Sequence, residues 1–583
     1  MTSTDTGTAP VTDSARPTPD QFANATWEDI APYYDALAER PLEPGDTAAI
    51  EAWLDDWNAL DVALSEAASL ANVAYSCDTA DPDKEAAYLR FTSQIAPSRE
   101  EQVVRLANKL LDTGYSRDDL ATTLRRFRTD RDLFREESIP LEQELSKLNA
   151  RYNKLTGGMT VEWEGDEIPL PRLNPFLLDP DRDVRERAFR LQFQPYIRHR
   201  DELADIFDAQ MAKRQQIARN AGFDNYRDYI FPAKHRYDYT PEDCFTFHRS
   251  VEQTFVPAIA RRLEARRQQM GLDSLRPWDT GVDPAGRPPL RPYRDIEELN
   301  AKTQDIFAKV DPLLGEQFGI MRQEHLLDLE SRKGKRPGGF CTSFPWRKRP
   351  FIFMNASGTG GDVRTLLHEA GHAFHGFASS NLPFVYQRMY GSEMAEVASM
   401  SMELLASPYL RVEDGGYYDA AEYKRARIEH LDGVLSIFAW VATVDAFQQW
   451  LYTDPAAADR DARDAKWLET WARFDPGVNW DGLTPERTAR WHKQLHIFLY
   501  PFYYIEYAIA QLGALQVWRN ALQDQEKAVA DYRAALALGG SRPLPDLFGR
   551  AGARLIFDAD GMAELASLIE GQIAELNAST TDA

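Results

Sequence analysis

The sequence predicts a large, mainly α-helical protein with a small β element near the middle of the chain. Most segments place apolar residues at intervals of three and four, which is the period of a helix. Two stretches, residues 159–173 and 326–355, instead show the alternation or short apolar runs of strands. At 583 residues the chain exceeds one simple core, so we expect several domains or one helical body with sub-lobes.

The composition argues against some classes of partner. Hydrophobic residues make up 43% of the chain and charged residues 27%, which is the balance of a soluble globular protein. The formal net charge of −24 would repel phosphates, so we expect neither nucleic acid nor an anionic membrane as a partner. We expect no apolar run of membrane-spanning length. The oligomeric state is left open.

The cysteines and the first residues bear on the cellular compartment. Cys77, Cys244 and Cys341 lie far apart and form no CxxC pair, so neither a disulfide framework nor a thiolate zinc site is expected. The polar first twenty residues lack the apolar core of a secretory signal. These features predict a reducing, cytoplasmic location.

The sequence divides into three parts. Residues 1–22 are rich in Ser, Thr, Asp and Pro and predict a disordered tail. Residues 23–180 predict an N-terminal helical region that ends with a small β-hairpin turning at Glu164-Gly165-Asp166. Residues 181–583 predict a second, larger helical region in which 326–332 and 349–355 are short strands.

Caps and periodicity place the helices in order. Asp179 followed by Pro180 predicts a helix start, and Gly222 predicts a C-cap. Residues 271–292, rich in Pro, Gly and Asp, predict a long surface loop. Helices are expected over residues 27–40, 46–75, 83–111, 117–134, after 140, over 179–193, 200–222, 295–307, 362–377 and 391–407, and from 501 onward.

The motif HEAGH lies in one of these helices, and Asp362 is its expected N-cap. His368, His372 and His375 share one face, because residues three and four apart are neighbours on a helix. Glu369 lies about 100° around the helix from His368. The two histidines of the motif can therefore present two imidazole nitrogens to one metal ion, with a carboxylate beside it. The alternative is a set of histidines that simply lines a polar helix face.

A catalytic zinc needs a third protein ligand and an open fourth position. The predicted helix 391–407 carries Glu393, Glu396 and Glu403. Small and apolar residues surround Glu396, so its carboxylate is expected to be buried and to need a partner such as a metal. Ordinary surface acids are the alternative interpretation.

The segment 491–518 combines a histidine with closely spaced tyrosines. It contains His496, Tyr500, Tyr503, Tyr504 and Tyr507. A helix is expected to start near Pro501, with Tyr504 and Tyr507 on one face. Buried tyrosine hydroxyls need hydrogen-bond partners, although an aromatic core stripe is the alternative.

HEAGHAFH, followed in the next predicted helix by the glutamate of AEVAS, resembles the M3 metallopeptidase family. The branch is the oligoendopeptidase F group, related to thimet oligopeptidase. The resemblance implies a zincin-type multi-helical fold with a deep enclosed substrate channel, and makes residues 181–583 the zinc peptidase catalytic region. It implies one Zn²⁺ per chain, held by His368, His372 and Glu396, with Glu369 as the general base.

The same resemblance assigns further roles. His496, Tyr504 and Tyr507 would face the zinc, hold the substrate backbone and stabilise the transition state. Glu403 would orient a histidine ligand from behind, and His375 would be a supporting residue. It stays open which of Tyr500, Tyr503, Tyr504 and Tyr507 contact the substrate.

The resemblance implies a zinc-dependent endopeptidase whose partners are short peptides. Internal peptide bonds would be hydrolysed by metal-activated water, with strand 349–355 as an edge that pairs with the substrate backbone. A helical-fold zinc metallocarboxypeptidase is the alternative. A peptide-binding protein with a degenerate site is a second one.

Overall fold

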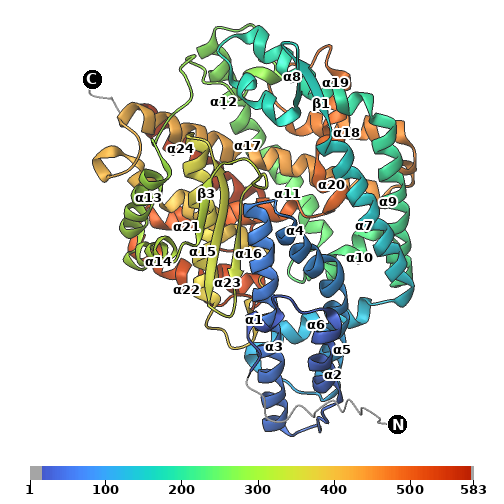
Figure 1. The fold of residues 1–583 in the computed structure, drawn as a ribbon. Helices are drawn as coiled ribbons and strands as arrows, with labels where there is room; N and C mark the ends of the chain where they lie inside the picture. The colour runs from blue at the N-terminus through green and yellow to red at the C-terminus, as the bar shows by residue number, and fades with distance from the viewer. Residues whose placement is uncertain (1–15, 579–583) are drawn as a thin grey trace, which may run out of the picture.

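The computed structural model describes residues 16–578, and helices dominate it (Figure 1). The prediction of a mainly α, multi-helical fold with small β elements is confirmed. The buried hydrophobic side chains form two separate cores. The larger core collects residues from Tyr152 to Ile573. The smaller one collects residues from Phe22 to Phe127, together with Phe384 and Tyr386, and belongs to a lobe that projects from the main body in Figure 1.

The projecting N-terminal lobe is built on a long helix whose Trp53 and Trp57 are fully buried. Its helices are α1 (Pro19–Phe22), α2 (Trp27–Glu39), α3 (Thr47–Cys77), α4 (Pro82–Leu89), α5 (Ala96–Asp112) and α6 (Ala121–Leu133). α1 lies within the segment that we expected to be a disordered tail. It is ordered because Phe22 is only 2% exposed and joins the smaller core. Residues 1–15 of that tail lie outside the described residues.

Two buried acids on α3 hold the lobe against the main body. Asp61 accepts hydrogen bonds from the hydroxyls of Tyr34, in the lobe, and Tyr386, in the body. Glu66 accepts from the backbone N–H groups of Trp346 and Arg347 at 2.6 and 2.8 Å. Because an unpaired buried carboxylate is costly, these contacts fix how the lobe meets the body.

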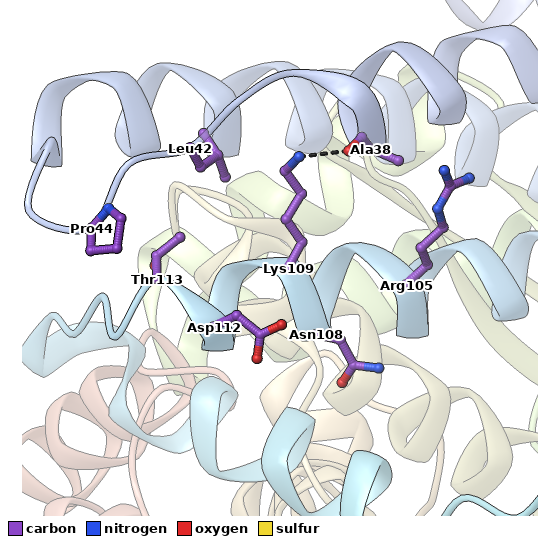
Figure 2. Close-up of a pocket in the computed structure, with 8 residues that line it drawn as sticks. All are labelled: Ala38, Leu42, Pro44, Arg105, Asn108, Lys109, Asp112 and Thr113. Atoms are coloured by element: carbon purple, nitrogen blue, oxygen red, sulfur yellow. Dashed lines mark hydrogen bonds between the residues drawn. The ribbon is translucent and has the colours of Figure 1, made fainter.

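The lobe also carries a surface cavity of about 370 Å³ between the α2–α3 connection and α5, shown in Figure 2. Lys109 crosses it and donates to the carbonyl oxygen of Ala38 at 2.6 Å. The remaining lining residues are Leu42, Pro44, Arg105, Asn108, Asp112 and Thr113. None of the residues predicted from the motifs lines this cavity.

The main body begins with α7 (Ile139–Gly157) and the hairpin of β1 (Thr160–Trp163) and β2 (Asp166–Pro169). Glu164 and Gly165 form its turn with φ of 56° and 93°, as a two-residue hairpin turn requires. The predicted hairpin is therefore present. Its buried residues belong to the larger core rather than to that of the lobe, and a domain boundary at residue 180 stays a prediction.

Helices make up most of the rest of the body. They are α8 (Arg182–Arg198), α9 (Arg200–Asn220), α10 (Tyr226–Ala233), α11 (Pro241–Gln253), α12 (Phe255–Met270), α13 (Ile296–Val310), α14 (Pro312–Gln323), α15 (Gly360–Ser379), α16 (Ser392–Leu405), α17 (Ala420–Thr453), α18 (Arg460–Phe474), α19 (Thr484–Lys493), α20 (Leu495–Leu499), α21 (Ile505–Ala521), α22 (Gln525–Leu536), α23 (Leu544–Arg550) and α24 (Ala559–Ala578). The predicted N-cap at Asp179 is wrong by two residues. Asp181 caps α8, because its side chain accepts from the N–H of Asp183.

α17 corrects the expectation that no segment reaches membrane-spanning length. By length and composition alone it could cross a bilayer, with a mean hydropathy of 1.3 over its most apolar window. However, 61% of that window is buried inside the protein. Its apolar residues fill the larger core, which accounts for their number.

A three-stranded sheet lies beside the histidine helix. Its strands are β3 (Leu327–Glu330), β4 (Phe340–Phe344) and β5 (Arg349–Ala356), in the order β3-β5-β4. The prediction that 349–355 is an edge strand is wrong, because β5 pairs with β3 on one side and β4 on the other. The antiparallel edge is β4. Continuous burial from Pro350 to Met354 fits a central strand.

Candidate active site

The histidine helix α15 lies near the centre of the body beside α16 and the sheet (Figure 1). Its N-cap is Thr359 rather than Asp362. Asp362 occupies the third helical position and reaches back to accept from the N–H of Thr359 at 2.7 Å, as in a capping box. The N-cap thus lies three residues earlier than predicted, and the helix starts at Gly360.

A glycine inside the motif lets α15 and α16 approach closely. A Cβ atom at Gly371 would lie 2.5 Å from the carbonyl oxygen of Ala398 and 2.5 Å from the Cα of Ser399. Only a residue without a side chain fits there. The contact brings the motif histidines to the face of α16 that carries Glu396.

The structure brings together three of the predicted donors, His368, His372 and Glu396. Their ligand atoms all lie within 4.8 Å of one another. Oε2 of Glu396 is 3.3 Å from Nε2 of His368 and 3.9 Å from Nε2 of His372. Donors around a tetrahedral zinc with bonds of about 2.0–2.2 Å lie at roughly these separations. The arrangement fits a divalent metal.

The electrostatics of the two histidines differ. Burial opposes charge on His368, but hydrogen bonds to Glu396 and Glu403 outweigh it and raise the His368 pKa to about 10. Burial lowers the pKa of His372 to about 4. A bound cation would therefore displace a proton from the first ring and find the second already neutral.

Glu403 lies behind His368, on the side away from Glu396. Its Oε1 accepts from Nδ1 of His368 at 2.8 Å, and its Oε2 is 3.1 Å from Nε2 of His430 on α17. Although burial opposes ionisation, the two histidines hold the pKa of Glu403 at about 2. Sequence reasoning missed His430, because no motif or helical spacing links α17 to this site.

Glu369 lies beside the three donors and is only 8% exposed. Burial raises its pKa to about 7. The backbone N–H of Cys341 on β4 lies near its carboxylate and favours the ionised form, against the larger effect of burial. Burial and the nearby Glu369 also raise the pKa of the Cys341 thiol, so this cysteine is a poor nucleophile.

His375 lies outside the set of metal donors. Its ring is fully buried and stacks on Tyr390 with the ring centroids 3.4 Å apart. Burial lowers its pKa well below the usual value, so it is neutral. Its contacts are those of a packing residue under α15.

The tyrosine segment differs from the prediction in its backbone. The helix expected from Pro501 begins at Ile505, because Phe502 takes a left-handed conformation with φ of 61°. The buried side chain of Arg236 donates to the carbonyl oxygen of Phe502 and, at 2.5 Å, to Oε1 of Glu506. It thereby holds both ends of the turn that carries Tyr503 and Tyr504.

The structure places the four tyrosines in different surroundings. The hydroxyl of Tyr504 accepts from the indole N–H of Trp440 at 3.1 Å. Tyr507 lies beside Tyr503, with the ring centroids 5.2 Å apart, and both lie near Glu396; burial raises the pKa of both. Tyr504 also lies beside Tyr507, with the ring centroids 5.5 Å apart, as expected of neighbours on one face. Tyr500 is 56% exposed.

His496 lies among these rings, 4.8 Å from that of Tyr504 and 5.9 Å from that of Tyr503. Burial lowers its pKa to about 4, so the ring is neutral. The side-chain amide of Gln494 donates to Nδ1 at 2.8 Å, which puts the ring proton on Nε2. His496 is therefore a hydrogen-bond donor at this atom.

The chain matches two family models over most of its length. Residues 176–567 match peptidase family M3, and residues 19–125 match the peptidase M3 N-terminal domain. The chain belongs to peptidase family M3. The predicted family, in its oligoendopeptidase F branch, is confirmed.

Individual relatives agree with this membership. An oligoendopeptidase F homolog of Borreliella burgdorferi is 24% identical over 384 residues, which cover 64% of this chain and 62% of that protein. The oligopeptidase PepF of Bacillus subtilis is 24% identical over 387 residues, covering 65% and 55%. These matches span less than two thirds of the relatives' length. The solved structure of PZ peptidase A with an inhibitor superposes with a TM-score of 0.84 at 26% identity, covering 97% of this chain and 99% of that one.

Proposed function

We propose that this M3 family member is a zinc-dependent endopeptidase that cleaves internal bonds of short oligopeptides. The observation that carries the proposal is the cluster of His368, His372 and Glu396, with a buried glutamate beside it. A catalytic zinc site has three protein donors, here two nitrogens and one oxygen, and leaves the fourth coordination position to water. A zinc ion held there would polarise the scissile carbonyl and lower the pKa of a water molecule to about 7.

Glu369 is the proposed general base. Its pKa of about 7 lets the carboxylate accept a proton from the attacking water near neutral pH. The backbone N–H of Cys341 lies near the carboxylate and favours its ionised form. The same group then delivers the proton to the leaving amine.

Tyr507 and His496 are the proposed donors to the oxygen that becomes negative in the transition state. The neutral His496 offers Nε2–H, and the high pKa of Tyr507 keeps its hydroxyl protonated. Donors held in place before the reaction stabilise such charge without reorganising. The ring of Tyr503 packs edge-on against the ring of Tyr507, with the centroids 5.2 Å apart, and supports its position.

β4 is the proposed edge for the substrate backbone. The backbone N–H of Cys341 lies near the carboxylate of Glu369, and β4, which carries it, is an edge strand of the sheet. The outer edge of β4 therefore runs past the general base, where an extended peptide can add as a further strand. An enclosed channel that admits only short peptides, and a cytoplasmic location, complete the proposal. The three free cysteines support this location.

An assay on quenched fluorescent peptides tests the proposal, with zinc content measured on the same samples. We expect Glu369→Gln to retain the metal and lose activity by a factor of about 10² to 10⁴. The matched control is Glu316→Gln, because this glutamate is exposed on α14. If wild type and Glu369→Gln were equally active, Glu369 would not be the general base.

A second substrate separates the endopeptidase from a zinc carboxypeptidase. An endopeptidase cuts a peptide whose C-terminus is amidated, whereas a carboxypeptidase needs the free carboxylate. We expect equal rates on the amidated and free forms. Cleavage of the free form alone would favour the carboxypeptidase.

A further inference from the structure

A chain of hydrogen bonds continues from the metal donors to the long helix α17. Nδ1 of His368 and Oε1 of Glu403 are 2.8 Å apart, and Oε2 of Glu403 is 3.1 Å from Nε2 of His430. An amino group of the Arg427 guanidinium is 2.9 Å from Nδ1 of His430. Four side chains from three helices thus form one continuous series.

The direction of every hydrogen bond follows from its last member. Arg427 has donors only, so it must donate to Nδ1 of His430. The neutral ring of His430 then carries its proton on Nε2 and donates to Glu403. The other oxygen of Glu403 accepts the Nδ1 proton of His368, which leaves Nε2 of His368 as the atom that faces Glu396.

The far end of the series is buried. Arg427 is only 4% exposed, and its guanidinium lies 5.8 Å from the ring centroid of Trp518 on α21. The side chains of Glu403 and His430 are each 13% exposed. Because buried polar groups are costly when unpaired, rotation of one member would leave its neighbours without partners.

We propose that His430, fixed by Arg427, is a positioning residue of the metal site. It holds the carboxylate of Glu403 and, through it, the tautomer and ring orientation of His368. This inference rests on the proposed function, since it requires His368 to bind a metal. Partners of this kind behind a metal ligand typically contribute about 10- to 100-fold in affinity.

Zinc affinity, measured on the full chain by competition with a chromogenic chelator, tests the inference without an activity assay. We expect His430→Leu to weaken zinc binding about 10- to 100-fold. His430→Gln offers both an acceptor and a donor, so it should recover most of the loss. The matched control is His248→Leu. His248 is also buried and pairs at 2.8 Å with a carboxylate of α17, Asp445, which lies outside the metal cluster.

A second measurement needs no variant. Nitrogen NMR of histidine-labelled, zinc-loaded wild type should show His430 protonated on Nε2 and His368 on Nδ1. A His430→Leu protein with wild-type zinc affinity, or His430 protonated on Nδ1, would overturn the inference while leaving the proposed function intact. A wild type that binds no zinc would overturn both.

Discussion

The two halves of the candidate site are built in different ways. In the metal half, the donors lie on two regular helices, α15 and α16, at spacings that repeat with the helical turn. In the tyrosine half, His496 and Tyr503 lie around a break between α20 and α21, where Phe502 is left-handed. The first half depends on local periodicity and one close helix contact. The second depends on partners from distant segments, such as Arg236 and Trp440.

The close helix contact gives the largest expected effect. Gly371→Ala places a methyl group 2.5 Å from backbone atoms of α16, so the helices must separate. We expect a loss of about 3 kcal/mol in the free energy of unfolding and zinc binding at least about 100-fold weaker. Denaturant titration and chelator competition measure the two effects.

Gly433→Ala is the control for that prediction. This glycine is also helical, in α17, and a Cβ atom there would meet nothing within 4 Å. It should leave stability and zinc affinity unchanged or slightly improved. Wild-type zinc binding by Gly371→Ala would mean that the metal half does not depend on this contact.

Substitutions in the tyrosine half should lower turnover and leave zinc affinity unchanged. We expect Tyr507→Phe to lower kcat by a factor of about 10² to 10³, as for loss of one oxyanion donor, with zinc affinity unchanged. Tyr504→Phe removes a hydroxyl that is bonded to Trp440 and should cost activity only a few-fold. Peptide kinetics on both variants decide the assignment, and the reverse order would restore Tyr504 as the donor.

Sequence reasoning identified the groups that helical spacing controls. The helix period placed His368 and His372 on one face, and the apolar neighbours of Glu396 pointed to a buried acid that needs a partner. Glu403 and Glu369 also lie where the motif and the resemblance suggested. For these residues, positions along a helix translate directly into positions in space.

The groups that sequence reasoning missed depend on tertiary contacts. His430 reaches the site because its side chain, on α17, pairs with Glu403 of α16 at 3.1 Å, and no pattern around residue 430 records that contact. Phe502 adopts a conformation that is uncommon for a non-glycine residue, since Arg236 and Gln448 hold its backbone. The prediction of the edge strand failed for a similar reason. Residues 349–355 form the central strand and β4 lies at the edge, and strand order cannot be read from the composition of one strand.

Replacing Arg236, which donates to the carbonyl oxygen of Phe502, should lower turnover less than removing an oxyanion donor does. We expect Arg236→Lys to lower kcat/KM about tenfold, less than the roughly 10² of a 1 Å misplacement, because the shorter lysine side chain keeps the charge but draws the donor nitrogen away from both acceptors. Zinc affinity should stay at the wild-type value. The control, Arg261→Lys, alters an arginine whose side chain is 61% exposed and pairs with Glu570. A loss of zinc rather than of turnover would show that the two halves are not independent.

The smallest expected effect comes from a residue of the metal half, Ser399. The hydroxyl of Ser399 donates at 3.0 Å to Oε2 of Glu396, the oxygen nearest to the two histidines. Removing a hydrogen bond worth about 1 kcal/mol should weaken zinc binding about fivefold in Ser399→Ala, with the kcat of the loaded enzyme unchanged. Ser407→Ala is the matched control, since this buried hydroxyl donates to the carbonyl oxygen of Leu404, away from the metal donors. If Ser399→Ala instead lowered kcat at full zinc loading, Glu396 would have to act on the substrate as well as on the metal. The division between a metal-holding half and a substrate-holding half would then fail.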